Sequence, residues 1–284
     1  MRYRIFGGIF LLSAIALALV GAKLLADRQA RIEEAANQKA VQVSWRAIEG
    51  WTIADIAGDL EKRGLVTEKD FNQGLKSALF SYDFLGELKD LTFKPSSLEG
   101  YLFPDTYFVA AKPTAKSVIQ KMLDNLGGKI TEQMRADIKK QNRSIFEVLT
   151  LASIVEKEVG RNTATTSAAD QQVLQEERET VAGIFMNRLK IGMALQSDAT
   201  IGYITKKNDP QASSADLLID SPYNTYKYRG LPPGPISNPS LSAIKAAIYY
   251  KDTDYLYFLT KKDGTAVYAK TLEEHNANKR KYLK

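Results

Sequence analysis

The sequence predicts an α+β protein with a single N-terminal transmembrane helix, a small α/β subdomain and a larger mixed α+β domain. Three observations support this prediction: an uncharged apolar run near the N-terminus, a strand–helix–helix pattern within residues 41–93, and a series of amphipathic helices with two late strands within residues 94–284. The chain has 284 residues, of which 44% are hydrophobic and 25% are charged, so it can bury one large core or two modest ones.

The apolar run comprises the 18 uncharged residues from Ile5 to Ala22, which is near the minimum for a membrane-spanning helix. A cleaved signal peptide usually has a shorter apolar region of about 7–15 residues. We therefore expect an uncleaved anchor over residues 5–25, with the basic tail of residues 1–4 in the cytoplasm, although basic residues on the other flank weaken this orientation. Residues 26–40 would then form a linker outside the cytoplasmic membrane.

Composition excludes several kinds of site. The chain has no cysteine, which excludes disulfides, thiolate metal sites and a cysteine nucleophile. Its one histidine, His275, argues against a histidine-rich metal site, and any Ser-His-Asp triad would need it. No phosphate-binding glycine motif is present. The net charge of +6 fits a membrane surface or an acidic polymer without pointing to nucleic acid, and we expect no metal and no cofactor.

Residues 41–93 contain the strand–helix–helix pattern. The alternating segment "VQVSW" predicts a strand. Thr52 is an N-cap for a helix that Gly64 ends, and the apolar residues of that helix lie at positions 53, 56, 57 and 60. A second helix begins after Thr67.

Residues 94–284 begin with the aromatic segment "SLEGYLFPDTYFV", where Pro104 and Asp105 indicate a turn. Helices are predicted over residues 114–126 and 131–141. We interpret the small polar segment "RNTATTSAADQQ" as a surface loop, followed by a helix in "ERETVAGIFMNRLKIG". A helix over residues 239–250, the strands "YLYFLT" and "AVYAK", and a last helix complete this part.

One helix carries an unexpected carboxylate. Ser144 and Glu147 form a capping-box signature at the start of "IFEVLTLASIVEKEV", and Gly160 is a plausible end. At about 100° per residue, Glu156 falls in the middle of the apolar face, whereas Glu158 falls on the opposite side and is predicted to be solvated. The residues of the apolar face are Ile145, Val148, Leu149, Ala152 and Val159.

Burial raises the pKa of a carboxyl group, and an acid that stays protonated near neutral pH can act as a general acid. Glu156 is therefore a candidate catalytic acid. A structural role, in which Glu156 pairs with an arginine or caps a neighbouring helix, stays open and is the commoner one on periodicity alone.

Two loops carry polar groups suited to a substrate. In "MALQSDATIGYI" the residues Gln196, Ser197 and Asp198 are crowded between apolar residues, which is typical of a substrate-facing loop or of a turn with local side-chain bonds. The segment "SPYNTYKYRGLPPGPISNPS" holds five of the nine prolines and includes Asn224 and Tyr226. Aromatic faces and amides suit sugar binding, and a well-packed structural loop is the alternative.

The segments "LEGYLFPDTY", "LASIVEKE", "VAGIFMNRLKIGMALQSDAT", "SPYNTYKYRGLPPGPISNPS" and "HNANKRKY" together resemble the MltG/YceG-like endolytic murein transglycosylases. The resemblance covers most of residues 41–284. It implies a LysM-like subdomain over residues 41–93 and a catalytic domain over residues 94–284 that faces the cell wall. It also implies that Glu156 is the catalytic acid, while the loop at residues 160–178 is longer than the family pattern.

The resemblance implies a lytic transglycosylase that cleaves the β-1,4 bond between N-acetylmuramic acid and N-acetylglucosamine and leaves 1,6-anhydro ends, so that it could terminate nascent glycan strands. We expect Gln196, Ser197, Asp198, Asn224 and Tyr226 to bind the substrate. The expected partners are glycan strands, the cytoplasmic (inner) membrane that the single-pass anchor enters, and peptidoglycan synthases or divisome proteins.

Two rival functions stay open. A hydrolytic muramidase would need a second carboxylate, for which Asp198 and Glu99 are the candidates. A non-catalytic anchor that binds the cell wall would need no catalytic acid, so replacing Glu156 would leave its function intact.

Overall fold

The structure is a computed structural model that describes residues 21, 23–26, 28–29, 42–77, 80–87, 98–159, 167–207 and 212–283. The predicted apolar run from Ile5 to Ala22 lies outside these residues except for Gly21, as does most of the predicted linker. Within the described part, no helix combines the length and the apolar character needed to cross a membrane. The boundary predicted after residue 93 also lies outside the described residues.

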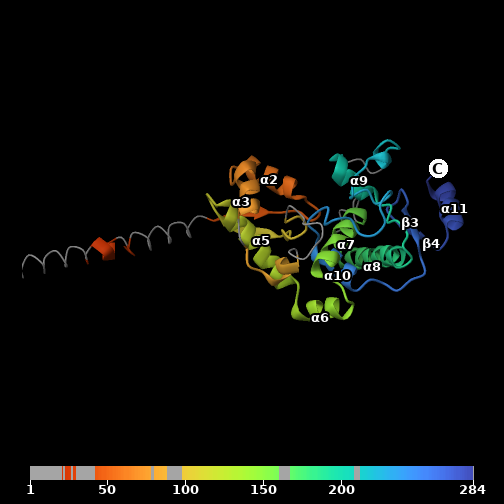
Figure 1. The fold of residues 1–284 in the computed structure, drawn as a ribbon, viewed down its shortest axis with the longest axis horizontal. Helices are drawn as coiled ribbons and strands as arrows, with labels where there is room; N and C mark the ends of the chain where they lie inside the picture. Colours follow the sequence, from red (N-terminus) through yellow and green to blue (C-terminus); the bar gives the residue numbers. More distant parts are fainter. Residues whose placement is uncertain are drawn as a thin grey trace, which may run out of the picture. The chain divides into compact units, whose positions relative to one another are not determined.

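The chain divides into two compact units, which are described separately. The first comprises the residues up to Trp45 together with Phe108–Pro113. The strands β1 (Gln42–Arg46) and β2 (Thr106–Ala110) pair in a two-stranded sheet, of which residues 42–45 and 108–110 belong to this unit (Figure 1). Burial alternates along β2, where Val109 is buried and Phe108 is exposed, as a strand with one covered face requires.

The second unit begins with α2 (Ile53–Lys62), α3 (Glu68–Ser77) and α4 (Asp83–Gly86), so the predicted order of strand, helix and helix is confirmed. Thr52 caps α2 with a complete capping box: its hydroxyl accepts from the Asp55 N–H, and the Asp55 carboxylate accepts from the Thr52 N–H. The buried residues of α2 are Ile53, Ile56, Ala57 and Leu60, the four predicted positions.

Three further helices match the sequence prediction: α5 (Ala115–Lys129), α6 (Glu132–Lys140) and α7 (Ile145–Glu158). Each begins after an N-cap hydroxyl that accepts an N–H of the first turn, and these hydroxyls belong to Thr114, Thr131 and Ser144. The helix α3 packs against both α2 and α5.

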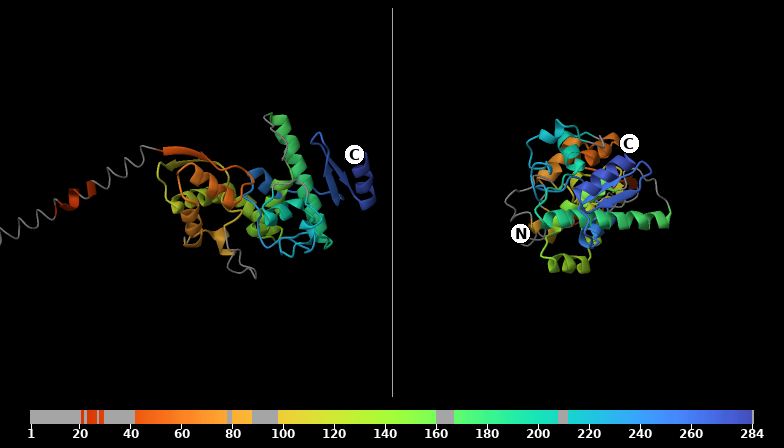
Figure 2. Two further views of the ribbon diagram at one scale, coloured as in Figure 1. Left: turned by 90° about the horizontal axis from the view of Figure 1, so that it is seen from above. Right: turned by 90° about the vertical axis from the view of Figure 1, so that its right-hand side faces the viewer.

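The helix α7 lies in the middle of the second unit. It packs against α8 (Ala168–Lys190), α9 (Asp198–Thr205) and α10 (Leu241–Ile248), and α10 also packs against α8 (Figures 1 and 2). Because neighbours surround α7, every residue from Val148 to Val155 is buried. This helix has no long solvated face, so the carboxylates at its C-terminal end enter a protein environment.

Gly183 permits the close approach of α8 to the chain that follows α10. A Cβ atom at this position would lie 2.2 Å from the backbone oxygen of Lys251. The Lys251 N–H donates to the Glu179 carbonyl oxygen at 3.0 Å, which fixes the approach.

The C-terminal part of the unit consists of β3 (Tyr257–Thr260), β4 (Ala266–Ala269) and α11 (Leu272–Tyr282). The strands pair antiparallel, with Tyr257 opposite Ala269, and α11 packs against both strands (Figure 1). Together with the helices, this hairpin confirms a mixed α+β fold.

Parts of two predicted loops are helical instead, and residues 160–166 of the first lie outside the described residues. The chain is helical from Ala168, ahead of the predicted start, because the Ser167 hydroxyl accepts from the Asp170 N–H and the following Ala, Gln and Glu residues favour a helix. Likewise, the segment from Asp198 to Thr205 is the helix α9 rather than a loop. A short 3₁₀ turn, η2 (Asp216–Leu218), follows it.

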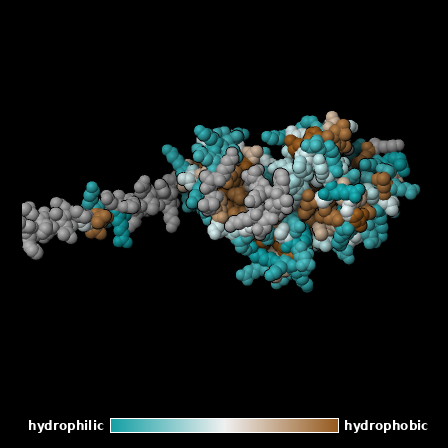
Figure 3. Space-filling view, viewed as in Figure 1, coloured by the Kyte–Doolittle hydropathy of each residue, from teal (hydrophilic) through white to brown (hydrophobic). Residues whose placement is uncertain are grey.

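The face drawn in Figure 3 is largely hydrophilic, with smaller apolar areas between the polar ones. Among the described residues, the exposed large apolar side chains of the second unit come from several elements, such as Leu218 in η2 and Leu272 in α11. Buried polar groups are therefore the more informative guide to a functional site.

Candidate active site

Glu156 lies in the last turn of α7, and its side chain is only 8% exposed. The backbone at Gly50 lies against it: a Cβ atom on this glycine would come within 3.5 Å of the Glu156 Cγ atom. Gly50 has a φ of +76°, and its N–H donates to the Asn238 carbonyl oxygen at 2.9 Å. The predicted burial of Glu156 is therefore confirmed.

Ser240, the N-cap of α10, holds one oxygen of the Glu156 carboxylate. Its N–H donates to Oε2 at 2.9 Å, and its hydroxyl donates to the same oxygen. In a complete capping box, a Glu side chain at the third helical position would accept this N–H. That position in α10 is Ala243, so Glu156 supplies the missing carboxylate from α7.

Arg178 of α8 faces the other oxygen. Its Nη2 lies 3.9 Å from Oε1, which is an ion pair beyond hydrogen-bond distance, and the side chain is 11% exposed. The buried Nε of Arg178 finds no acceptor among the residues that the structure describes. A purely structural role for Glu156 would require that it caps a neighbouring helix or pairs with an arginine. The structure shows both contacts.

Asn238 connects the segments around the carboxylate. Its amide donates to the Trp51 carbonyl oxygen at 2.9 Å and to Glu99 Oε1 at 3.0 Å, and its Oδ1 accepts from the Leu102 N–H at 2.9 Å. Asn238 is fully buried. Asn238 thus fixes the backbone two residues before Ser240, the residue that holds Glu156.

Glu99 is buried, and its two oxygens accept from the Ile53 N–H at the start of α2. Burial raises the pKa of Glu99 to about 8, against the hydrogen bonds that lower it. At neutral pH this carboxyl is mostly protonated, which makes it a poor nucleophile.

Glu158 is only partly solvated, so the prediction of a solvated charge is corrected. Its Oε1 accepts from the Ser197 hydroxyl at 2.5 Å, and the residue is half-buried. The helical period placed it opposite Glu156 correctly, but that side of α7 meets α9 rather than water. Ser197 is 2% exposed, so its hydroxyl faces Glu158 instead of an open surface.

The remaining predicted site residues differ in exposure. Gln196 is exposed and has a φ of +50°. Asp198 is half-buried and accepts from the Tyr226 hydroxyl at 2.7 Å. Burial, and after it the hydrogen bond to Asp198, raises the pKa of Tyr226. Asn224 is fully buried, and its amide donates to the carbonyl oxygens of Leu217 and Ile219 at 3.0 and 2.8 Å.

Three residues of the site were absent from the prediction: Arg178, Asn238 and Ser240. Only Ser240 carried a usable signal, since a serine before an apolar helix is a probable N-cap. Arg178 stands at the start of a predicted helix, and nothing in the sequence joins it to Glu156.

No group of His, Asp or Glu side chains in the described part of the chain is arranged to hold a metal ion. His275 lies in α11 and stacks on Tyr257 at 5.3 Å, and burial lowers its pKa. Within the described part of the chain, no interaction joins His275 to the carboxylate of Glu156.

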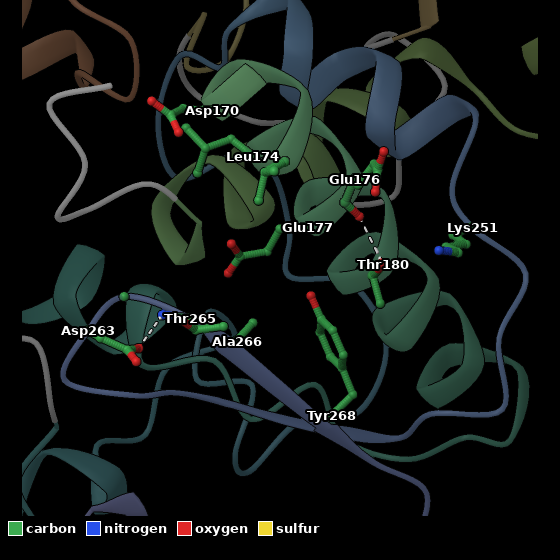
Figure 4. A pocket seen from close by; sticks show the side chains of 12 residues that line it. Asp170, Leu174, Glu176, Glu177, Thr180, Lys251, Asp263, Thr265, Ala266 and Tyr268 are labelled. Atoms are coloured by element: carbon green, nitrogen blue, oxygen red, sulfur yellow. Dashed lines mark hydrogen bonds between the residues drawn. The ribbon is translucent and has the colours of Figure 1, made fainter. Parts of the chain in front are cut away.

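A separate cavity of about 420 Å³ lies between α8 and the β3–β4 turn (Figure 4). Asp170, Glu177 and Thr180 of α8 line it together with Asp263 and Tyr268. Burial raises the pKa of Glu177. None of the predicted site residues lines this cavity, so its size does not identify the active site.

Comparison with known proteins identifies the family of the chain. The family model of the YceG-like family matches residues 23–281. An endolytic murein transglycosylase of Bacillus subtilis (strain 168) is 42% identical over 186 residues, which cover 66% of this chain and 48% of that protein. One of Streptococcus pneumoniae serotype 2 is 34% identical over 241 residues, which cover 80% of this chain and 41% of that protein.

The chain thus spans about half the length, or less, of the curated relatives it matches. The crystal structure of a YceG-like protein of Listeria monocytogenes shares the fold with a TM-score of 0.69 at 33% identity, covering 82% of this chain and 75% of that one. With a family match over nearly the whole chain and a matching fold, the protein belongs to the YceG-like family.

Proposed function

We propose that the chain is a peptidoglycan lytic transglycosylase in which Glu156 acts first as the acid and then as the base. The observation that carries the proposal is a buried carboxyl group with one oxygen held by Ser240 and the other facing a cation. The names of the relatives, endolytic murein transglycosylases, support the substrate class.

In the first step, protonated Glu156 gives its proton to the oxygen of the β-1,4 bond between N-acetylmuramic acid and N-acetylglucosamine. The C1–O bond breaks, the N-acetylglucosamine end leaves with a hydroxyl, and an oxocarbenium-like centre forms at C1 of the muramic acid. Oε1 is the oxygen suited to carry the proton, because Oε2 already accepts two hydrogen bonds from Ser240.

In the second step, the Glu156 carboxylate takes the proton of the muramic acid C6 hydroxyl, whose oxygen attacks C1. The product ends in 1,6-anhydro-N-acetylmuramic acid, and Glu156 is again protonated. One carboxylate suffices because the nucleophile belongs to the same sugar and therefore has a high effective concentration. During this step Ser240 holds Oε2 in place, and Arg178 lies beside Oε1.

The substrate contacts proposed here are narrower than the set expected from the sequence. Gln196 offers an exposed amide, and Asp198 with Tyr226 offers a linked carboxylate and phenol at a half-buried position. Ser197 and Asn224 use their side chains inside the protein, so we assign them to holding the two loops.

The structure gives no support to a hydrolytic muramidase, because neither candidate for its second carboxylate, Glu99 or Asp198, is a free carboxylate. Glu99 is protonated at neutral pH and engaged by Ile53 and Asn238, and Asp198 accepts from Tyr226. A wall-binding protein without activity would use Glu156 only as the carboxylate that caps α10 and pairs with Arg178, so Glu156→Gln would leave its function intact.

Mass spectrometry of digested glycan strands tests the reaction. We expect muropeptides lighter by one water than the hydrolysed species, with early shortening of strands because the cuts are internal. New muramic-acid ends that borohydride reduces, in proportion to cleavage, would show that water was the nucleophile. Glu156→Gln protein is the control for contaminating activities.

The location is proposed from the sequence. The apolar run from Ile5 to Ala22 supports a single-pass anchor in the cytoplasmic membrane, with the rest of the chain on its outer side. The order β1, α2, α3 supports a LysM-like subdomain, and a role at nascent strands would bring peptidoglycan synthases or divisome proteins near. Protease added to intact spheroplasts should degrade the chain, and full protection until lysis would contradict the orientation.

A further inference from the structure

Gln196 has an unusual backbone conformation. It is one of three non-glycine residues with a positive φ in the described ranges, the others being Asn142 and Lys206. Those two follow the ends of helices α6 and α9, where a left-handed residue is common. Gln196 ends no helix, and left-handed backbone outside such positions is often found where function requires it.

Buried contacts on both sides force this conformation. The Leu195 carbonyl oxygen accepts from Arg188 Nη1, the Gln196 N–H donates to the Thr225 carbonyl oxygen at 3.0 Å, and the Ser197 N–H donates to Thr225 Oγ1 at 3.1 Å. Leu195, Ser197 and Thr225 are each at most 2% exposed, whereas Gln196 is exposed. The turn therefore presents one amide side chain outward from a fixed frame.

Thr200 completes this frame from the first turn of α9. Its hydroxyl donates to the Ser197 carbonyl oxygen at 2.8 Å and lies 2.9 Å from Thr225 Oγ1. Because the Thr200 proton is used toward Ser197, the Thr225 hydroxyl is the donor to Thr200. The two threonines and Ser197 thus form a closed buried network.

Glu158 joins this frame to the catalytic helix. Its carboxylate accepts from the Ser197 hydroxyl at 2.5 Å, which is a charge-assisted contact. The negative charge also acts on Arg188, where it opposes the fall in pKa that burial causes. Glu158 and Glu156 belong to the same rigid turn of α7, so a fixed Ser197 gives Gln196 a fixed place relative to Glu156.

We propose that Glu158 is a positioning residue that holds the strained turn at Ser197, so that the Gln196 amide binds the acetamido group of an amino sugar in the glycan. The proposal rests on the proposed function and names a binding contact within it. An amide offers one acceptor and two donors, which match the N–H and C=O of an acetamido group. Glu158 acts through Ser197 and does not itself touch the substrate.

A double-mutant cycle tests the connection, with glycan strands freed of stem peptides as the substrate. Glu158→Ala and Ser197→Ala should each lower kcat/KM by about tenfold, mainly through KM, because each removes the same charge-assisted contact. The double variant should lose no more than either single variant. Glu158→Gln keeps an acceptor and should recover part of the loss. Multiplied losses in the double variant would overturn the proposal.

Gln196→Gly provides a second test, which distinguishes substrate binding by the amide from a purely structural role. Glycine relieves the left-handed backbone and removes the amide, so Tm should rise while KM rises severalfold. Lys206→Gly is the matched control, since it relieves a similar φ of +56° and should raise Tm without changing KM. Unchanged KM in Gln196→Gly would overturn the assignment of the amide.

These outcomes are separable from a failure of the proposed function. If wild-type protein releases no 1,6-anhydro ends, the proposed reaction is wrong. If wild-type protein releases them and the Glu158, Ser197 and Gln196 variants all retain its KM, only the positioning role is wrong. Circular dichroism of each variant establishes that the compared proteins are folded.

Discussion

The two glutamates at the end of α7 make similar contacts in different surroundings. Each carboxylate accepts a hydrogen bond from the hydroxyl of an N-cap serine. The donor to Glu156 is Ser240 of α10, and the donor to Glu158 is Ser197 of α9. The Ser240 hydroxyl also accepts from the Ala243 N–H, so it caps its helix, whereas the Ser197 hydroxyl makes no cap bond. The same pair of residue types therefore holds the proposed catalytic carboxyl on one side and the proposed binding turn on the other.

The difference lies in the remaining partners. Glu156 has a cation 3.9 Å from Oε1 and accepts both the N–H and the hydroxyl of Ser240 at Oε2. On the other side, the Ser197 N–H goes to Thr225 instead of the carboxylate. A contact between a glutamate and a serine does not define a role by itself, and here the partner of the serine N–H differs between the two sites.

The largest expected effect separates the two glutamates directly. Glu156→Gln keeps the shape of the side chain and removes the proton, so activity on glycan strands should fall by about 10² or more, the usual scale of general acid–base catalysis. Glu158→Gln should cost less because an acceptor for Ser197 remains. Equal losses in initial rates would contradict the division of roles.

The cation beside Oε1 of Glu156 is the next point to test. Arg178→Gln should lower kcat by about tenfold with little change in KM, because Arg178 attracts the negative charge that develops on Glu156 as it gives up its proton. Arg178→Lys keeps the charge and should recover part of the activity. If Lys and Gln variants lose the same activity, the guanidinium acts by shape and not by charge.

Ser240→Ala removes the hydroxyl from Glu156 and from the N-terminus of α10. We expect a loss of about 1 kcal/mol in the free energy of unfolding, as for other N-caps, and a severalfold fall in kcat. Thr131→Ala is the matched control: it removes the cap of α6, where the hydroxyl accepts from Met134 at 3.2 Å. Denaturant unfolding should show similar losses for both variants, with a rate effect in Ser240→Ala alone.

The smallest effect on activity is expected at Glu99, which affects stability instead. Its pKa rises on folding from 4.5 to about 8, so the folded state binds the proton more tightly than the unfolded state. The stability gained from this proton is complete below pH 4.5 and is lost as the pH rises through about 8. Glu99→Gln should remove that pH dependence and raise Tm relative to wild type more at pH 8 than at pH 5. A constant Tm difference across this range would contradict the raised pKa.

The fold could be predicted where local rules act alone. Thr52, Thr114 and Ser144 mark helix starts because a hydroxyl before an apolar repeat satisfies free N–H groups in any context. The start of α8 was missed because the cap at Ser167 lies in a segment of small polar residues that also suits a loop. Similarly, the helix α9 was missed because Ser197, its N-cap residue, makes no cap bond of its own.

The sequence by itself determined the position of Glu156, since the helical period and the apolar neighbours together place a carboxyl where burial is expected. It also determined the family through the order of its motifs. Only the tertiary structure decided that Ser240 and Arg178 meet this carboxyl, that Glu158 is covered, and that Glu99 is engaged by Ile53 and Asn238. These contacts join residues far apart in the chain, and periodicity describes one helix without describing what packs against it.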